Sequence, residues 1–282
     1  MAKKKLMIHD FYRMKKDGEK ITFLTSYDFP TAQFAEAAGM DMLLVGDSLG
    51  MCVYGYPGTV PVTMDQCICH AEAVRRGAPN TFVVGDMPFM SYQSSIEKAV
   101  ENAGRFLKEA GCDAIKLEGG VRVGPQIRAI VDAGIIVMGH IGLTPQSSGQ
   151  LGGHKAQGRT VESARAVVED ALAVQAAGAH MILLEAIPPE VAGYIRRTLA
   201  IPALSIGAGL DCDGQLLIVS DMIGQFQAFT PKFVKKYCNV AEVVTNAMKQ
   251  YVAEVRGNKF PEDEHCYHML PGELEKFQAE YK

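Results

Sequence analysis

Eight short apolar runs recur along the chain, and segments with helical periodicity fill most of the gaps between them. The predicted strands begin near Ile21, Met42, Thr81, Asp113, Ile135, His180, Ile201 and Gln215. Strands that alternate with helices form parallel sheets, because each helix carries the chain back to the start of the next strand. Eight such units in a chain of 282 residues favour a (β/α)₈ barrel, and a doubly wound open sheet is the alternative.

Local signals mark where the predicted helices begin and end. Glycine accepts the left-handed conformation that closes a helix, and it stands shortly before a predicted strand at Gly39, Gly77, Gly111, Gly134 and Gly178. The segments Thr63–Gln66 and Ser94–Glu97 match the capping box, in which a hydroxyl and an acid or amide three residues later satisfy free backbone donors. We expect helices to begin there.

Residues 1–282 are predicted to form a single domain, although three segments depart from the repeat. A lead segment covers about residues 1–20, and the tail at about 257–282 is expected to be irregular. Residues 142–160 are polar and rich in glycine, and they follow the fifth predicted strand. In a barrel this loop lies on the active-site face, where we expect a mobile lid.

Composition and charge exclude several classes of protein. The chain is 48% hydrophobic and 21% charged, which is typical of a globular protein. Its net charge of −4 argues against nucleic acid or an anionic membrane as a partner. No apolar run approaches the roughly 20 residues of a membrane-spanning helix, and no secretory signal is recognisable. The seven cysteines are odd in number and irregularly spaced, so we expect a reduced, cytoplasmic protein.

Three of the predicted strands run into an acidic residue, namely Asp47, Asp86 and Glu118. The carboxyl ends of parallel barrel strands meet on one face, so these carboxylates are expected to converge. Burying like charges together is costly unless a cation neutralises them. Oxygen ligands without a converging histidine or cysteine favour Mg²⁺ over zinc. The alternative is that Asp47 and Asp86 each cap the following helix.

Lys116 lies two residues before Glu118 and therefore faces the same side of its strand. It could bind a substrate carboxylate, neutralise Asp86 or Glu118, or form a Schiff base. Glu118 has the longest side chain of the three acids, and we expect it to reach a metal through water.

Later strands also end in polar residues. Glu185 follows the run 180–184, across the predicted barrel from the three acids, and a carboxylate in an apolar wall suits a general base. The alternative is an ion pair with a loop arginine or lysine. His140 either hydrogen-bonds a substrate or is a satisfied core histidine. Residues 205–209 (Ser-Ile-Gly-Ala-Gly) either present backbone donors to an anion or form a tight turn.

Five segments resemble the ketopantoate hydroxymethyltransferase family: Val45–Gly50, Gly85–Phe89, Ile115–Gly120, Gly139–Gln146 and Pro231–Tyr237. The resemblance extends over about residues 8–268, with minor departures at Gly85 and Met87. It implies a Mg²⁺-binding (β/α)₈ barrel that transfers a hydroxymethyl group from 5,10-methylenetetrahydrofolate to 3-methyl-2-oxobutanoate, a 2-oxo acid. The product, ketopantoate, serves pantothenate and coenzyme A synthesis. The resemblance also implies a homo-oligomer, commonly a decamer.

The resemblance assigns roles to individual residues of this chain. It implies metal binding by Asp47, Asp86 and Glu118, substrate binding by Asp47, Ser48, Asp86 and Lys116, and catalysis by Glu185 as the proton acceptor.

Two other functions are compatible with the same acids. A related metal-dependent C–C lyase with a barrel fold would act on an oxo or hydroxy acid. Such enzymes typically carry a Lys-x-Cys-Gly-His loop, and the sequence has no Cys-Gly-His. A non-catalytic protein that binds a metal or an oxo acid would bind its ligand without exchanging a proton. The inward position predicted for Glu185 argues against it.

Overall fold

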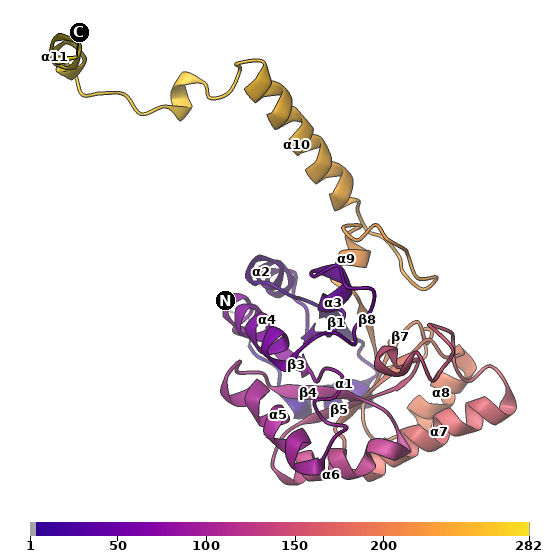
Figure 1. Ribbon diagram of the computed structural model, residues 1–282. Coiled ribbons are helices and arrows are strands. Elements are labelled where there is room, and N and C mark those ends of the chain that lie inside the picture. Colours follow the sequence, from indigo (N-terminus) through magenta and orange to yellow (C-terminus); the bar gives the residue numbers. More distant parts are fainter. Residues whose placement is uncertain (1–3, 282) are drawn as a thin grey trace.

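Figure 1 shows the computed structural model of the chain, which describes residues 4–281. Within these residues eight parallel strands close into a barrel, and the last strand pairs with the first. The strands are β1 (Ile21–Thr25), β2 (Met42–Val45), β3 (Phe82–Asp86), β4 (Ala114–Glu118), β5 (Val137–Gly142), β6 (Met181–Glu185), β7 (Ala203–Ile206) and β8 (Gly214–Leu217). The predicted (β/α)₈ barrel is confirmed, and the open sheet is wrong. Residues 1–3 and 282 of the predicted domain lie outside the described residues.

A helix follows every strand except β7, which a short loop joins to β8, and the helices cover the outside of the barrel (Figure 1). The α-helices are α1 (Ile8–Asp17), α2 (Phe29–Ala37), α3 (Leu49–Cys52), α4 (Met64–Gly77), α5 (Ile96–Lys108), α6 (Gly124–Asp132), α7 (Val161–Ala176), α8 (Pro189–Thr198), α9 (Val219–Met222), α10 (Val240–Arg256) and α11 (Glu273–Glu280). Short 3₁₀ turns occur at η1 (Val121–Val123), η2 (Pro145–Ser147) and η3 (Asp263–His265). The larger core cluster is formed where this helical layer packs on the outward-facing strand residues.

The interior of the barrel is filled by apolar side chains at the amino ends of the strands, here called the lower end. It is polar at the carboxyl ends of the strands, the upper end. Successive side chains on a strand point to opposite faces, so every second residue enters the barrel. Phe23, Met42 and Phe82 fill the lower interior together with Phe11 of α1, whose ring meets Phe82 edge-on at 5.1 Å between centroids. The lead segment therefore supplies a helix that closes the lower end. The same inward register places Asp86 at the upper end of β3.

Of the two helix starts predicted from capping boxes, the one at Thr63 is correct and the one at Ser94 is displaced by one residue. Thr63 begins α4 with the expected capping box. Helix α5 is capped by Ser95, not Ser94, because the Ser95 hydroxyl accepts the amide of Lys98. Glu97 is therefore one position too early to complete a capping box.

Most of the predicted glycine helix ends adopt the left-handed conformation. Positive φ angles from 65° to 99° occur at Gly39, Gly111, Gly134 and Gly178. Gly77 is different, because it is the last residue of α4. A side chain there would collide with the backbone carbonyl of Phe29, so glycine allows α2 to pack closely on α4.

Helix α10 and the residues after it extend away from the barrel (Figure 1). No residue of α10 is buried, although the helix carries several apolar side chains. The prediction of an irregular tail beyond Gly257 is wrong in part, since η3 and α11 form there. Glutamates in the first turn of α11 favour its start, because they interact well with the positive end of the helix dipole. None of the helices within residues 4–281 is long and apolar enough to cross a membrane.

Candidate active site

A cavity of about 920 Å³ opens at the carboxyl ends of the barrel strands. Side chains from the strand ends and from the loops that follow them line its walls, which is where barrel enzymes place their active sites. The three acids predicted from the strand ends, Asp47, Asp86 and Glu118, all lie in this cavity and are called the acid cluster below.

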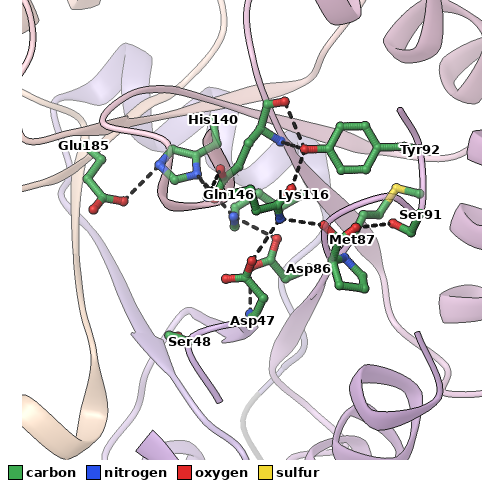
Figure 2. Close-up of polar contacts among 12 residues, drawn as sticks. Asp47, Ser48, Asp86, Met87, Ser91, Tyr92, Lys116, His140, Gln146 and Glu185 are labelled. Carbon is green, nitrogen blue, oxygen red and sulfur yellow. Dashed lines mark hydrogen bonds and ion pairs between the residues drawn. The ribbon is translucent and has the colours of Figure 1, made fainter. Parts of the chain in front are cut away.

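The acid cluster is buried and internally connected (Figure 2). The backbone amide of Asp47 donates to the carboxylate of Asp86 at 2.9 Å. Gln146 bonds two members, since its side chain donates to Asp47 at 2.9 Å and its backbone amide to Glu118 at 3.0 Å. The helix-capping alternative is wrong, because these carboxylates bond within the cluster and to Gln146, while Ser95 caps the helix after Asp86.

Burial and mutual repulsion make the cluster electrostatically unfavourable on its own. Burial, together with the charges of Asp86 and Glu118, raises the pKa of Asp47 well above its ordinary value. Burial also raises the pKa of Asp86, although Lys116 opposes the shift with its Nζ 2.8 Å from an Asp86 oxygen. The surrounding carboxylates overcome the desolvation of Lys116 and raise its pKa, so it stays charged. Three roles were expected for Lys116: binding a substrate carboxylate, neutralising a neighbouring acid or forming a Schiff base. The ion pair shows that it neutralises Asp86.

His140 lies between the acid cluster and Glu185 (Figure 2). Its Nε2 is 3.0 Å from Glu185 and its Nδ1 is 3.5 Å from Glu118. Burial and the charge of Lys116 oppose protonation, but the two glutamates outweigh them and raise the pKa of His140 to about 9. The prediction that Glu185 stands in an apolar wall is therefore wrong on the side that faces His140. The alternative was an ion pair with a loop lysine or arginine, but the partner in the structure is this histidine.

Two residues of this hydrogen-bond network were not predicted. Tyr92, in the loop before α5, donates to the side chain of Gln146 at 2.8 Å, and its hydroxyl accepts the backbone amide of Glu118 at 3.0 Å. Gln146 lies in η2, at the start of the glycine-rich segment 142–160, and is 5% exposed. The η2 turn at the start of this segment therefore forms part of the wall of the site. That the rest of segment 142–160 moves as a lid stays a prediction. Gln146 stands in one of the family-like segments, whereas nothing in the local sequence marks Tyr92.

Ser48 and the segment 205–209 complete the comparison with the predicted site. Ser48 lines the cavity, and its hydroxyl is 2.8 Å from that of Tyr27. The segment 205–209 forms a tight turn, because the Ser205 hydroxyl accepts the amide of Ala208 and Gly207 adopts a φ of +70°. The turn alternative is therefore confirmed there.

The donor set of the acid cluster suits a hard divalent cation. One oxygen of Glu118 is buried without a hydrogen bond, and one oxygen of Asp86 has only its ion pair with Lys116. A cation with oxygen ligands would satisfy such atoms and offset the repulsion among the acids. As the side chains stand, no group of three potential ligands in the described part of the chain has a metal-binding arrangement. Metal binding would therefore require their rotamers to adjust.

Comparison with known families gives this geometry a context. The family model described as ketopantoate hydroxymethyltransferase matches residues 5–263. The chain belongs to this family. The 3-methyl-2-oxobutanoate hydroxymethyltransferase of Alkaliphilus metalliredigens (strain QYMF) is 65% identical over 284 residues, which cover 100% of both chains. The protein of the same name from Moorella thermoacetica is 54% identical over 254 residues, covering 90% of this chain and 94% of its own.

Solved structures outside the ketopantoate hydroxymethyltransferase family share the fold. A phosphonopyruvate hydrolase solved with oxalate and Mg²⁺ aligns with a TM-score of 0.61 at 13% identity, covering 98% of this chain and 96% of its own. A 2,3-dimethylmalate lyase, described as a member of the PEP mutase/isocitrate lyase superfamily, aligns with a TM-score of 0.57 at 18% identity, covering 98% and 99%. At these identities the likeness concerns the fold alone.

Proposed function

We propose that this chain transfers a hydroxymethyl group from 5,10-methylenetetrahydrofolate to 3-methyl-2-oxobutanoate in a Mg²⁺-dependent reaction. The product is ketopantoate, for pantothenate and coenzyme A synthesis. The observation that carries the proposal is that one cavity holds the acid cluster with Lys116 on one side and Glu185 on the other. The family match and the names of the relatives supply the substrate.

Each polar group of the cavity has a task in this reaction. Asp47, Asp86 and Glu118 would hold Mg²⁺, which when bound acts as a Lewis acid and acidifies the C3–H of the 2-oxo acid. Lys116 carries the positive charge that a substrate carboxylate requires, and Ser48 supplies a hydroxyl beside the cluster; Asp47 and Asp86 also contact the substrate in this proposal.

Glu185 removes the C3 proton, and His140 orients its carboxylate from 3.0 Å away. The resulting carbon nucleophile attacks the methylene carbon of the folate. The methylene carbon gains one carbon–carbon and one carbon–oxygen bond while its bonds to N5 and N10 both break. Water supplies the hydroxyl oxygen, and the C3 proton and one proton of that water end on the two nitrogens of the departing tetrahydrofolate.

The first test is hydrogen exchange at C3 of 3-methyl-2-oxobutanoate in D₂O, followed by NMR. We expect the protein to catalyse exchange with Mg²⁺ and to lose it in EDTA, because proton removal depends on the metal. A boiled sample gives the uncatalysed rate. Absence of exchange in both samples, even with folate present, would contradict the proposal and favour the lyase or the binding protein.

A cytoplasmic location and a homo-oligomer, with the decamer as the expected size, belong to the same proposal. Helix α10 supports assembly, because it buries no residue within the described chain and exposes apolar side chains. Its aromatic contact, between Tyr251 and Phe260, is with the segment just beyond its own end. The exposed apolar residues are Val243, Val244, Met248, Tyr251, Val252 and Val255. Single exposed apolar residues are normal, but a stripe of them along one helix is typical of a contact surface.

Met248→Glu should shift the protein towards smaller species. Met248 is 63% exposed in the isolated chain, and a glutamate there would bring an unpaired charge into a subunit contact. Size-exclusion chromatography with light scattering over a range of concentrations measures the mass. Lys249→Glu changes an exposed charge on the same helix and should keep the wild-type mass. An unchanged mass for Met248→Glu would show that α10 does not hold the assembly together.

A further inference from the structure

Asp221 is a second buried acid in the active-site cavity, separate from the acid cluster. It lies in α9, immediately after β8, and is 4% exposed. Its carboxylate has no hydrogen bond or ion pair with any group in residues 4–281. Burial raises the pKa of Asp221 to about 6, although the more distant charge of Lys236 opposes the shift. Asp221 is therefore largely ionised at neutral pH and lacks a partner.

An unpartnered buried carboxylate destabilises a fold, so its place in the molecule calls for a reason. Asp221 lines the cavity, which means that the group it lacks can come from a ligand. An ionised carboxylate is only an acceptor of hydrogen bonds, and its two oxygens suit a pair of parallel N–H donors. The backbone that carries it is held in place, since the amide of Val219 donates to the hydroxyl of Thr25 at 3.0 Å.

On the side of β8 and the segment after α9 the wall around Asp221 is apolar and partly aromatic, while the Tyr27 hydroxyl and the Cys52 thiol are close enough on the other side to feel its charge. The cavity is lined there by Leu216 and Ile218 from the β8 end and by Phe226, Phe229 and Phe233 from the segment after α9. Phe226 and Phe229 meet edge-on at 5.7 Å between centroids. Such a wall favours a flat ring system, because aromatic side chains bury large areas against planar ligands. Asp221 and this wall together suit a planar ligand with paired N–H donors on one edge.

The topology of the barrel assigns this wall to a second substrate. In a closed barrel of eight strands β8 is opposite β4, so Asp221 stands across the mouth from Lys116 and Glu118. A 2-oxo acid held at the acid cluster leaves the β8 side of the cavity free. A carbon donor approaching from there would reach the reacting carbon between the two sites.

We propose that Asp221 binds the pterin ring of 5,10-methylenetetrahydrofolate by accepting hydrogen bonds from the ring N3–H and the 2-amino group. These two donors stand side by side on the pyrimidine edge of the pterin, matching the two oxygens of one carboxylate. The ring packs on the phenylalanines after α9. This inference rests on the proposed function and deepens it, because it assigns the co-substrate to a named side chain.

Asp221→Asn tests the inference, since it keeps the shape but turns one acceptor into a donor. We expect the KM for 5,10-methylenetetrahydrofolate to rise about 10- to 100-fold, the usual effect of losing a charged hydrogen bond. Folate-independent C3 exchange of the 2-oxo acid should stay close to the wild-type rate, which also shows that the variant is folded. Asp211→Asn, at an exposed aspartate of the loop before β8, is the matched control.

A folate analogue without the 2-amino group tests the proposed hydrogen bond from the side of the ligand. In 2-desamino-2-methyl-5,10-methylenetetrahydrofolate the amino donor is replaced by a methyl group. The wild type should use it far less well than the natural donor, and Asp221→Ala should lose most of that discrimination. An unchanged KM in Asp221→Asn, or exchange that falls in parallel with turnover, would overturn the inference alone. A wild type without exchange or turnover would instead remove the proposed function on which it rests.

Discussion

Replacing Glu185 with glutamine should abolish C3 exchange of 3-methyl-2-oxobutanoate and leave Mg²⁺ binding nearly intact. Glutamine has the shape of glutamate, but its amide cannot take up the proton. Loss of a general base typically lowers a rate by about 10²- to 10⁴-fold, so exchange should approach the uncatalysed rate. Glu185 ends β6, across His140 from the acid cluster, so the expected metal ligands are untouched by the change.

Exchange by NMR and Mg²⁺ binding by calorimetry separate these two effects. Glu190→Gln is the control, because Glu190 is exposed in the first turn of α8 and close to Glu185 in the chain. It should exchange and bind metal like the wild type. Retained exchange in Glu185→Gln would show that another group takes the proton, whereas loss of both exchange and metal affinity would place Glu185 among the metal-binding groups.

The barrel and its acid cluster follow from short-range patterns in the sequence. Each predicted strand start lies within two residues of the observed one, because alternating apolar runs and helix ends are local signals. Asp86, Glu118 and Glu185 are the last residues of β3, β4 and β6, so the parallel topology by itself brings them to one end of the barrel.

Contacts that depend on loops could not be predicted in the same way. Tyr92 and Gln146 are 54 positions apart in the sequence, and their hydrogen bond exists only because two loops fold over the same strand ends. The partnership of His140 with Glu185 likewise depends on side-chain direction across neighbouring strands β5 and β6. The helix in the tail was missed for another reason, since α11 spans only eight residues and helical periodicity is hard to recognise over two turns.

Asp86→Ala should remove Mg²⁺ dependence and activity together. Asp86 contributes one of three clustered carboxylates and is also the ion-pair partner of Lys116 at 2.8 Å. Losing a metal ligand forfeits several kcal/mol of Lewis-acid stabilisation, which corresponds to a fall in rate of at least about 10³-fold. Initial rates measured over a range of Mg²⁺ concentrations should be low and flat, and calorimetry should detect no tight binding.

Asp86→Asn separates the charge of Asp86 from its shape. Asparagine can still accept the backbone amide of Asp47, which Asp86 accepts at 2.9 Å, but it brings no negative charge to the metal or to Lys116. If charge decides, the asparagine variant should be as impaired as the alanine variant while melting near the wild-type temperature. Asp65→Ala, at an exposed position of α4, controls for the loss of an acid. Saturable Mg²⁺ activation with an unchanged half-saturation concentration in Asp86→Ala would contradict a metal role for Asp86, since Asp47 and Glu118 would then suffice without it.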